Sequence, residues 1–287
     1  MQAGRAAPQT AVTGFSLVEL AIVLGIVGIL MLSLMSTLSS QVDQRNFDDT
    51  RRRLEQAREL LLGFAIVNGR LPCPARSVAT ASPVTVAGDE VMTTATGCIG
   101  DAVTDYYGGV NGAVTLGLLP ARTIGFQQLD AAGFAVDAWG NRLRYAVANL
   151  TTPSGSCPTP HFVNAANLKT NGIACQPNDL LICKSANPAT AAPPIAGPAI
   201  TATTCGGGTN QIMAQSQVVA IVFSTGKNGG IACATCIDEV ANTNGNRVFV
   251  FHTPSSSTAA NGEFDDQITW ITVGELYGKL ITAGVLP

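Results

Sequence analysis

Eight cysteines are the residues of this 287-residue chain whose chemistry is easiest to predict. All of them follow Leu71, and so many cysteines are typical of a protein that forms disulfides in an oxidising compartment. Structural zinc is the competing interpretation, but the chain has one C-x-x-C motif and two histidines, so a second closely spaced ligand pair is missing. We therefore expect disulfides among Cys73, Cys98, Cys157, Cys175, Cys183, Cys205, Cys233 and Cys236.

Spacing leaves most of the pairing open, because eight cysteines allow many connectivities. Cys73 and Cys98 flank one loop and form a plausible bridge by proximity. Cys233 and Cys236 form the C-x-x-C motif, which can serve as a redox pair with a lowered thiol pKa. The motif follows Gly229-Gly230 without the strand-to-helix setting of a thioredoxin site, so a local structural disulfide is the favoured interpretation.

Enzyme signatures are missing from the sequence. There is no nucleophile elbow, no H-E-x-x-H zinc motif and no phosphate-binding G-x-x-x-x-G-K-[ST] loop. His161 and His252 are more simply surface or packing residues than members of a dispersed catalytic triad. We therefore do not expect an enzyme.

One carboxylate, Glu19, precedes an uncharged apolar run from Leu20 to Leu38. As a helix this run would be about 28 Å long, close to the hydrocarbon thickness of a membrane. An acidic group at the head of such a run costs free energy and is therefore a functional candidate. The sequence thus predicts a membrane-spanning helix over about residues 17–38, with Glu19 as a functional residue.

The residues Gly14-Phe15-Ser16-Leu17-Val18-Glu19-Leu20 resemble the type IV prepilin signature. The resemblance implies that a prepilin peptidase cuts between Gly14 and Phe15 and N-methylates Phe15. It also implies that Glu19 pairs with the terminal amine of a neighbouring subunit, since a buried carboxylate is tolerable beside an ammonium. The implied partners are other pilin or pseudopilin subunits, the membrane, and an inner-membrane assembly platform with a cytoplasmic ATPase.

The fold class expected is α+β, a pilin-like lollipop. Its parts are a leader over residues 1–14, a long N-terminal helix over 15–68 with a membrane-spanning first half, and a mainly antiparallel β-sheet head over 69–287. The helix ends at Asn68-Gly69, a stop signal followed by Pro72. We expect a last helix over 274–283, with Thr272 and Glu275 at capping-box spacing, and strands over 142–147, 180–183, 218–223, 247–251 and 268–273.

Several pieces of the head resemble a subgroup of pseudopilin-like proteins, in the same order along the chain. They are Gly69–Pro74, the turn Asp137–Arg142, the loop Ser224–Gly229 and Phe264-Asp265-Asp266 with Trp270. The turn and the Ser-x-Gly loop are similar to those of the major pseudopilin of type II secretion. In that family a C-terminal loop binds calcium through carboxylate and backbone oxygens, so the resemblance implies a possible calcium cofactor. An ordinary acidic turn is the alternative for the matching residues, which are Asn261, Glu263, Asp265 and Asp266.

The composition contains 12% charged residues and the net charge is −3, so nothing attracts nucleic acid globally. We expect a structural prepilin-type subunit of a type IV pilus or a type II secretion pseudopilus, with a minor role because the head is large. The expected location is the bacterial inner membrane, with the head in the periplasm, and then the filament or cell surface. The alternative is a membrane-anchored periplasmic enzyme or receptor with a chance N-terminal resemblance.

Overall fold

The computed structural model describes residues 16–77, 86–94, 97–98, 107, 110–111, 114–115, 117–149, 151–152, 157–186, 205, 210–229, 231, 233 and 235–286. For residues 32–40, 93–94, 110–111, 114–115 and 151–152 it describes the backbone alone. The chain divides into two compact units, one that ends at Asn46 and one over Phe47–Pro287.

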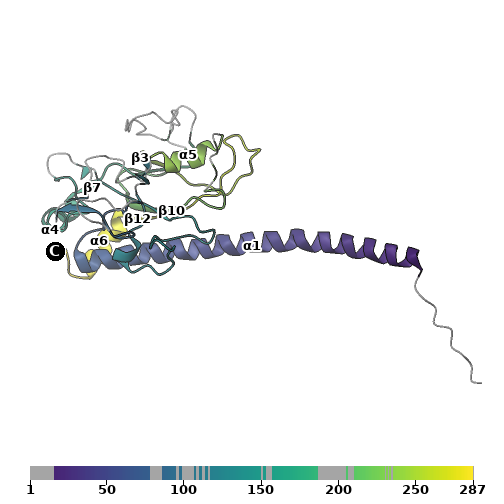
Figure 1. Ribbon diagram of the computed structural model, residues 1–287. Coiled ribbons are helices and arrows are strands. Elements are labelled where there is room, and N and C mark those ends of the chain that lie inside the picture. Colours follow the sequence, from purple (N-terminus) through teal and green to yellow (C-terminus); the bar gives the residue numbers. More distant parts are fainter. Residues whose placement is uncertain are drawn as a thin grey trace, which may run out of the picture. The chain divides into compact units, whose positions relative to one another are not determined.

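Helix α1 covers Leu17–Asn68 and contributes to both units (Figure 1). Its start has the form of a capping box, in which a hydroxyl and a carboxylate satisfy amides that the first helical turn leaves unpaired. The Ser16 hydroxyl accepts from the Glu19 amide at 3.2 Å, and the Glu19 carboxylate accepts from the Ser16 amide at 2.9 Å. Glu19 therefore has a local structural role that the S-x-x-E spacing could have predicted.

The expectation of a membrane-spanning first half is wrong. In the part of the chain that the structure describes, no helix combines the length and the apolar character needed to cross a membrane. The pilin-like lollipop with a membrane-spanning first half is therefore not the fold class found.

The second unit combines short helices and short strands with the last part of α1. Its further helices are α3 (Ala121–Ile124), α4 (Ala165–Asn171), α5 (Ile237–Thr243) and α6 (Val273–Thr282), with a 3-10 turn η1 (Gly172–Ala174). Its strands are β1 (Met92–Thr94), β2 (Gly97–Cys98), β3 (Val110–Asn111), β4 (Val114–Thr115), β5 (Arg144–Val147), β6 (Thr151–Thr152), β7 (Gln176–Pro177), β8 (Leu181–Cys183), β9 (Gln211–Met213), β10 (Val218–Ser224), β11 (Val248–Val250) and β12 (Gln267–Thr272).

The main sheet has the strand order β12-β10-β5 and is antiparallel. Every residue of β10 is buried, as its uninterrupted apolar sequence predicted for a central strand. Leu54, Leu61 and other residues of α1 belong to the same hydrophobic cluster as β10 and α6, and these elements lie side by side in Figure 1. The Arg58 side chain adds a polar link, because it pairs with Glu275 and donates to the carbonyl of Trp270 at 3.1 Å.

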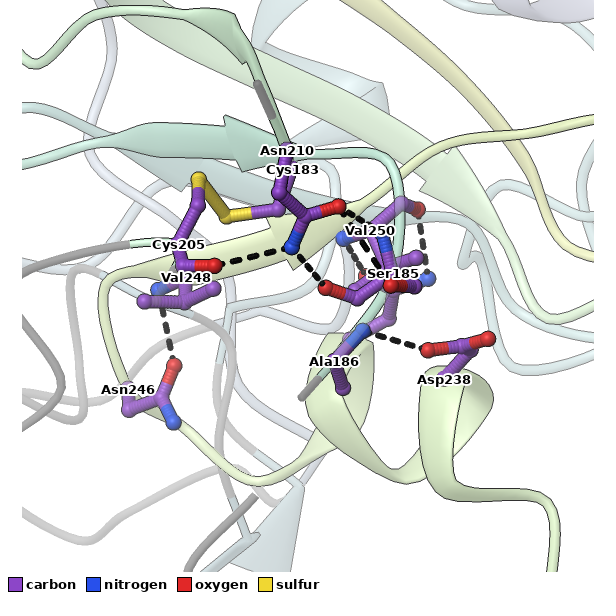
Figure 2. Close-up of a disulfide and its surroundings, with 10 residues drawn as sticks. Cys183, Ser185, Ala186, Cys205, Asn210, Asp238, Asn246, Val248 and Val250 are labelled. Carbon is purple, nitrogen blue, oxygen red and sulfur yellow. Dashed lines mark hydrogen bonds between the residues drawn. A yellow bond between two sulfur atoms is a disulfide. The ribbon is translucent and has the colours of Figure 1, made fainter. Parts of the chain in front are cut away.

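A second three-stranded sheet has the order β11-β8-β9. Strands β8 and β11 are parallel, whereas the other strand pairs among the described residues are antiparallel, as expected for a mainly antiparallel sheet. Figure 2 shows the disulfide Cys183–Cys205 beside this sheet, where the Asn210 amide donates to the carbonyls of Cys205 and Ser185, each at 2.8 Å. This region is therefore held by a covalent bond and side-chain amides as well as by a small apolar cluster.

All eight cysteines form disulfides. The predicted bridge Cys73–Cys98 is confirmed, as is a disulfide within Cys233–Cys236. The other two, Cys157–Cys175 and Cys183–Cys205, could not be paired from the sequence. The predicted cap of the last helix is also present, since the Thr272 hydroxyl accepts from the Glu275 amide at 3.3 Å.

Candidate metal centre

The turn Asp137–Arg142 lies against the end of β10. One oxygen of Asp137 accepts from the amides of Trp139 at 2.9 Å and Asn141 at 2.8 Å. Its other oxygen accepts from the Ser224 hydroxyl at 2.6 Å, and both side chains are buried. Burial raises the Asp137 pKa, against these hydrogen bonds, which lower it. The turn Asp137–Arg142 and the loop Ser224–Gly229, which the sequence analysis identified separately, are thus hydrogen-bonded to each other.

The loop after β10 extends this hydrogen-bond network to Asp265. The Asn141 side chain donates to the carbonyl of Gly226 at 2.6 Å, and the amides of Lys227 and Asn228 donate to one oxygen of Asp265 at 3.0 and 3.2 Å. Gly226 has a φ of +65°, and a Cβ at this position would overlap the Asp265 carboxylate. Glycine is therefore required for the loop to wrap around the carboxylate.

Helix α5 brings two further polar side chains to the same place. Glu239 accepts from the Asp265 amide at 3.0 Å and from the Asn228 side-chain amide at 2.9 Å. One turn later, the side-chain amide of Asn242 donates to Asp266 at 2.7 Å. Residues three apart lie on one face of a helix, so α5 presents this face to the loop that precedes β12.

Three carboxylates meet here, and we call Glu239, Asp265 and Asp266 the acidic cluster. One carboxylate oxygen from each lies within 4.8 Å of the others. Burial raises the pKa of all three groups, that of Asp265 to about 6 and that of Asp266 well above its usual range. The nearby guanidinium of Arg144 acts the other way on Asp266. Without a cation, the cluster therefore takes up protons more readily than free carboxyl groups do.

Two oxygens of the cluster have no hydrogen-bond partner. They are Oδ1 of Asp265 and Oδ1 of Asp266, on side chains that are 7% and 3% exposed. A buried carboxylate oxygen without a partner costs free energy, and a cation is one way to remove that cost. Glu239 and Asp266 also line a pocket of about 330 Å³ with Thr225, Asn228 and Cys233, so an ion and its water ligands have room beside them.

The chemistry of these donors fits a hard divalent cation. Calcium takes six to eight oxygen ligands, from carboxylates, backbone carbonyls and water. The three carboxylates would supply negative charge in excess of the positive charge of Arg144. Asn228 and Thr225, whose side chains carry oxygen atoms, also line the pocket. The cluster therefore suits Ca²⁺ better than a softer metal that prefers nitrogen or sulfur.

Two of the four residues expected in the calcium site belong to the cluster, and two do not. Asp265 and Asp266 are members. The Asn261 side chain instead donates to Asp238 at 3.0 Å, and Glu263 is not among the three clustered acids, although its charge raises the pKa of Glu239 and Asp265. Sequence reasoning missed Glu239; a signal was available in Asp238-Glu239, because acidic residues favour the first turn of a helix.

Asp238 holds the start of α5 in place. It accepts from the Ala186 amide, as Figure 2 shows, from Asn261 and from the ring of His252 at 3.2 Å. The other ring nitrogen of His252 faces the carbonyl of Thr253 at 2.6 Å. Both nitrogens are thus engaged by these two groups. Hydrogen bonding to Asp238 raises the His252 pKa.

The remaining predicted site residues lie at the start of the chain or in the disulfides. Gly14 and Phe15 lie outside the described residues. Glu19 lies in the first unit, whereas the acidic cluster lies in the second. Because all eight cysteines are bonded in pairs, none is available as a thiolate ligand for zinc.

Comparison with known proteins identifies no relative. No protein-family model matches the chain, and searches of curated proteins and of solved structures return no match.

Proposed function

We propose that this chain is a prepilin-type structural subunit, cut between Gly14 and Phe15, N-methylated on Phe15 and assembled into a filament. The observation that carries the proposal is the Gly14–Leu20 signature, followed at once by a helix with an exposed apolar surface. The filament would be a type IV pilus or a type II secretion pseudopilus, with this chain as a minor subunit. A prepilin peptidase and an assembly platform with its ATPase would act on it.

The exposed surface is the physical reason for assembly. Aliphatic side chains of α1 from Leu17 to Met31 are mostly more than half exposed, among them Leu17 at 85% and Ile29 at 69%. Apolar area gains roughly 25 cal/mol per Å² when it leaves water, so this surface favours a partner. Copies or homologues that present the same helix would cover it. Exposed apolar patches of this kind are typical of protein or membrane contacts.

Glu19 supports the same proposal through charge. Cleavage after Gly14 would create an ammonium group on Phe15, next to Ser16. The Glu19 carboxylate already accepts from the Ser16 amide, and it has oxygen lone pairs left for an ammonium of a neighbouring subunit. Packing such a pair among apolar helices neutralises both charges, whereas removal of one partner leaves the other unpaired.

The disulfides support a location outside the cytosol. The chain has four disulfides, and structural disulfides are typical of compartments where thiols are kept oxidised, such as the periplasm or the cell surface. In the proposal the second unit faces that compartment, and α1 provides the contacts between subunits.

Mass spectrometry of the N-terminus, in cells with and without the prepilin peptidase, tests the proposal. We expect a methylated Phe15 start that depends on the peptidase and is abolished by Gly14→Leu. Gly25→Leu is the matched control, since nothing lies within 4 Å of a Cβ there. Glu19→Gln should leave cleavage intact and reduce assembly, while Glu59→Gln should not. An intact Met1 in cells that contain the peptidase would refute the proposal.

The acidic cluster favours a second property, which is cation binding by the second unit. We infer that Glu239, Asp265 and Asp266 hold Ca²⁺, because two of their buried oxygens have no hydrogen-bond partner and a pocket adjoins them. Such an ion would join α5 to the loop before β12 and would stabilise the second unit by binding the folded state only.

Calorimetric titration of the metal-free chain with CaCl2 tests the inference. We expect saturable binding that Asp266→Asn and Glu239→Gln weaken at least tenfold. Glu55→Gln, which changes an exposed carboxylate of α1, is the matched control and should bind normally. If the unaltered chain binds neither Ca²⁺ nor Mg²⁺ at millimolar concentration, the cation site does not exist.

A further inference from the structure

One disulfide differs from the other three in loop length and exposure. Cys233–Cys236 closes a sequence separation of 3 residues, whereas the others close 18, 22 and 25. A shorter loop gives a smaller entropic gain for the whole fold. Cys233 is partly exposed, while the six cysteines of the other disulfides are at most 7% exposed. This disulfide is therefore the one that a reductant in solution reaches most easily.

Both cysteines of this disulfide lie close to the acidic cluster. Cys233 lines the pocket that Glu239 and Asp266 line. Cys236 is the residue before α5, and its carbonyl accepts the first hydrogen bond of that helix from the Val240 amide at 3.0 Å. Glu239 lies in the first turn that this bond closes. The covalent link thus fixes the start of α5 relative to the pocket wall.

The segment around Cys236 also packs on the loop that leads to Asp265. The Ile237 amide donates to the carbonyl of Asn261 at 2.9 Å. Gly262 has a φ of +81°, and a Cβ there would lie 2.9 Å from the Cα of Cys236. Glycine is therefore required where this loop approaches Cys236. Because these contacts couple Cys236 to the loop, a displacement of Cys236 would alter the spacing between Glu239 and Asp265.

We propose that Cys233–Cys236 is a redox-sensitive support of the cation site, and that its reduction weakens divalent cation binding. The inference rests on the cation site proposed above. Reduction removes the covalent bond that holds Cys236 next to the pocket. The first turn of α5, which carries Glu239, then becomes more mobile, and ion binding must order it again. Ordering a released segment costs conformational entropy, and the cost appears as lower affinity.

A dithiol reduces this disulfide by two successive thiol–disulfide exchange steps. Its thiolate attacks Sγ of Cys233, the S–S bond breaks, and Sγ of Cys236 leaves with the electron pair and takes up a proton. The second thiol of the reductant, as its thiolate, then attacks the mixed disulfide and releases Cys233, which takes up a proton. Two cysteine thiols form, and the dithiol is oxidised to its cyclic disulfide.

Calcium titration of the full chain, with and without prior treatment by dithiothreitol at a concentration that spares the buried disulfides, tests the proposal. Thiol labelling and mass spectrometry confirm which cysteines are reduced. We expect the Kd for Ca²⁺ to rise about tenfold when Cys233 and Cys236 are reduced. The double variant Cys233→Ser/Cys236→Ser should show the same rise without reductant and no further response to it.

The double variant Cys157→Ser/Cys175→Ser is the matched control, because it removes a disulfide that does not line the pocket. Circular dichroism establishes that each variant is folded. An unchanged Kd in folded Cys233→Ser/Cys236→Ser overturns the redox proposal and leaves the cation site standing. Absence of binding by the oxidised, unaltered chain overturns the cation site, and this proposal falls with it.

Discussion

The main sheet and the α5 region of the second unit are stabilised in different ways. Around β10 the main sheet buries a continuous apolar cluster that includes α1 and α6. The α5 region, which we define as α5, the sheet β11-β8-β9 and residues 261–266, contributes Ile182 and Phe249 to that cluster and otherwise has small apolar clusters. It depends more on disulfides and on buried carboxylates and amides.

This difference shows where solution conditions can act. Apolar burial does not change with pH, redox state or cation concentration within the physiological range. Buried carboxylates and accessible disulfides do respond to these conditions. We therefore expect the main sheet to set the stability of the second unit, and the α5 region to make that stability conditional.

The largest effect should come from the main core. Phe223 is fully buried in β10, and its ring packs edge-to-face on Phe249 with centroids 5.6 Å apart. Phe223→Ala should lower the free energy of unfolding by about 3–5 kcal/mol, because it removes buried area and leaves a cavity. Urea unfolding measures the change. Ile281→Ala, on the exposed side of α6, should stay within about 0.5 kcal/mol.

The disulfide beside β8 should come next. Cys183→Ser/Cys205→Ser opens a loop of sequence separation 22 and should cost about 3 kcal/mol by the chain-entropy relation. Urea unfolding under oxidising conditions compares the variant with the unaltered chain. A loss clearly greater than that of Phe223→Ala would mean that the α5 region is no less important to overall stability than the main core.

The turn Asp137–Arg142, which is hydrogen-bonded to the end of β10, should have a smaller effect. Asp137→Ala removes the acceptor for two backbone amides and for the Ser224 hydroxyl, at a cost of about 2 kcal/mol. Asp137→Asn keeps an oxygen for the two amides and should cost about 1 kcal/mol or less. Equal losses for both variants would show that the negative charge, rather than the acceptor geometry, stabilises the turn.

The smallest effect should be a pH dependence that a cation reverses. Because the pKa of Asp265 is raised to about 6 in the folded chain, its protonation favours folding, and this contribution is lost as pH rises through about 6. Ca²⁺ binds the ionised form and should restore stability at higher pH. The groups that act on the cluster are Glu239, Asp266, Glu263, Asp238 and Arg144.

Melting curves from pH 4 to 8, with and without CaCl2, measure this prediction. The stabilisation by Ca²⁺ should be small below pH 5 and should grow above pH 6. Burial lowers the pKa of His161 to about 4, so His161 favours folding as pH rises and opposes the trend of Asp265. This contribution is the same with and without CaCl2, so it cancels when the two melting temperatures at each pH are subtracted. A stabilisation by Ca²⁺ that does not vary with pH would place the ion outside the acidic cluster.

Local patterns in the sequence were enough to predict several elements of the second unit. The apolar run VVAIVF predicted β10, found over Val218–Ser224, and capping-box spacing predicted the start of α6 at Thr272. These predictions succeed because strand alternation, apolar runs and caps depend on neighbours in the chain. The Cys73–Cys98 disulfide could be predicted because its cysteines flank one loop.

Local patterns misled the prediction at the start of the chain. The apolar run after Glu19 indicated a membrane span, yet among the described residues no helix meets the requirements for one. Apolar character along a sequence does not distinguish lipid from a protein partner, because both remove the same surface from water. The identity of the partner is therefore a matter for the assembly experiment.

The sequence by itself determined the number of cysteines, the strands with strong apolar character, the caps, and the Gly14–Leu20 resemblance. Only the tertiary structure decided the pairs Cys157–Cys175 and Cys183–Cys205, the parallel register of β8 and β11, and the meeting of Glu239 with Asp265 and Asp266. These contacts join residues far apart in the chain. Their closeness arises from the packing of whole elements around β10, and the local propensities of the contacting residues do not encode it.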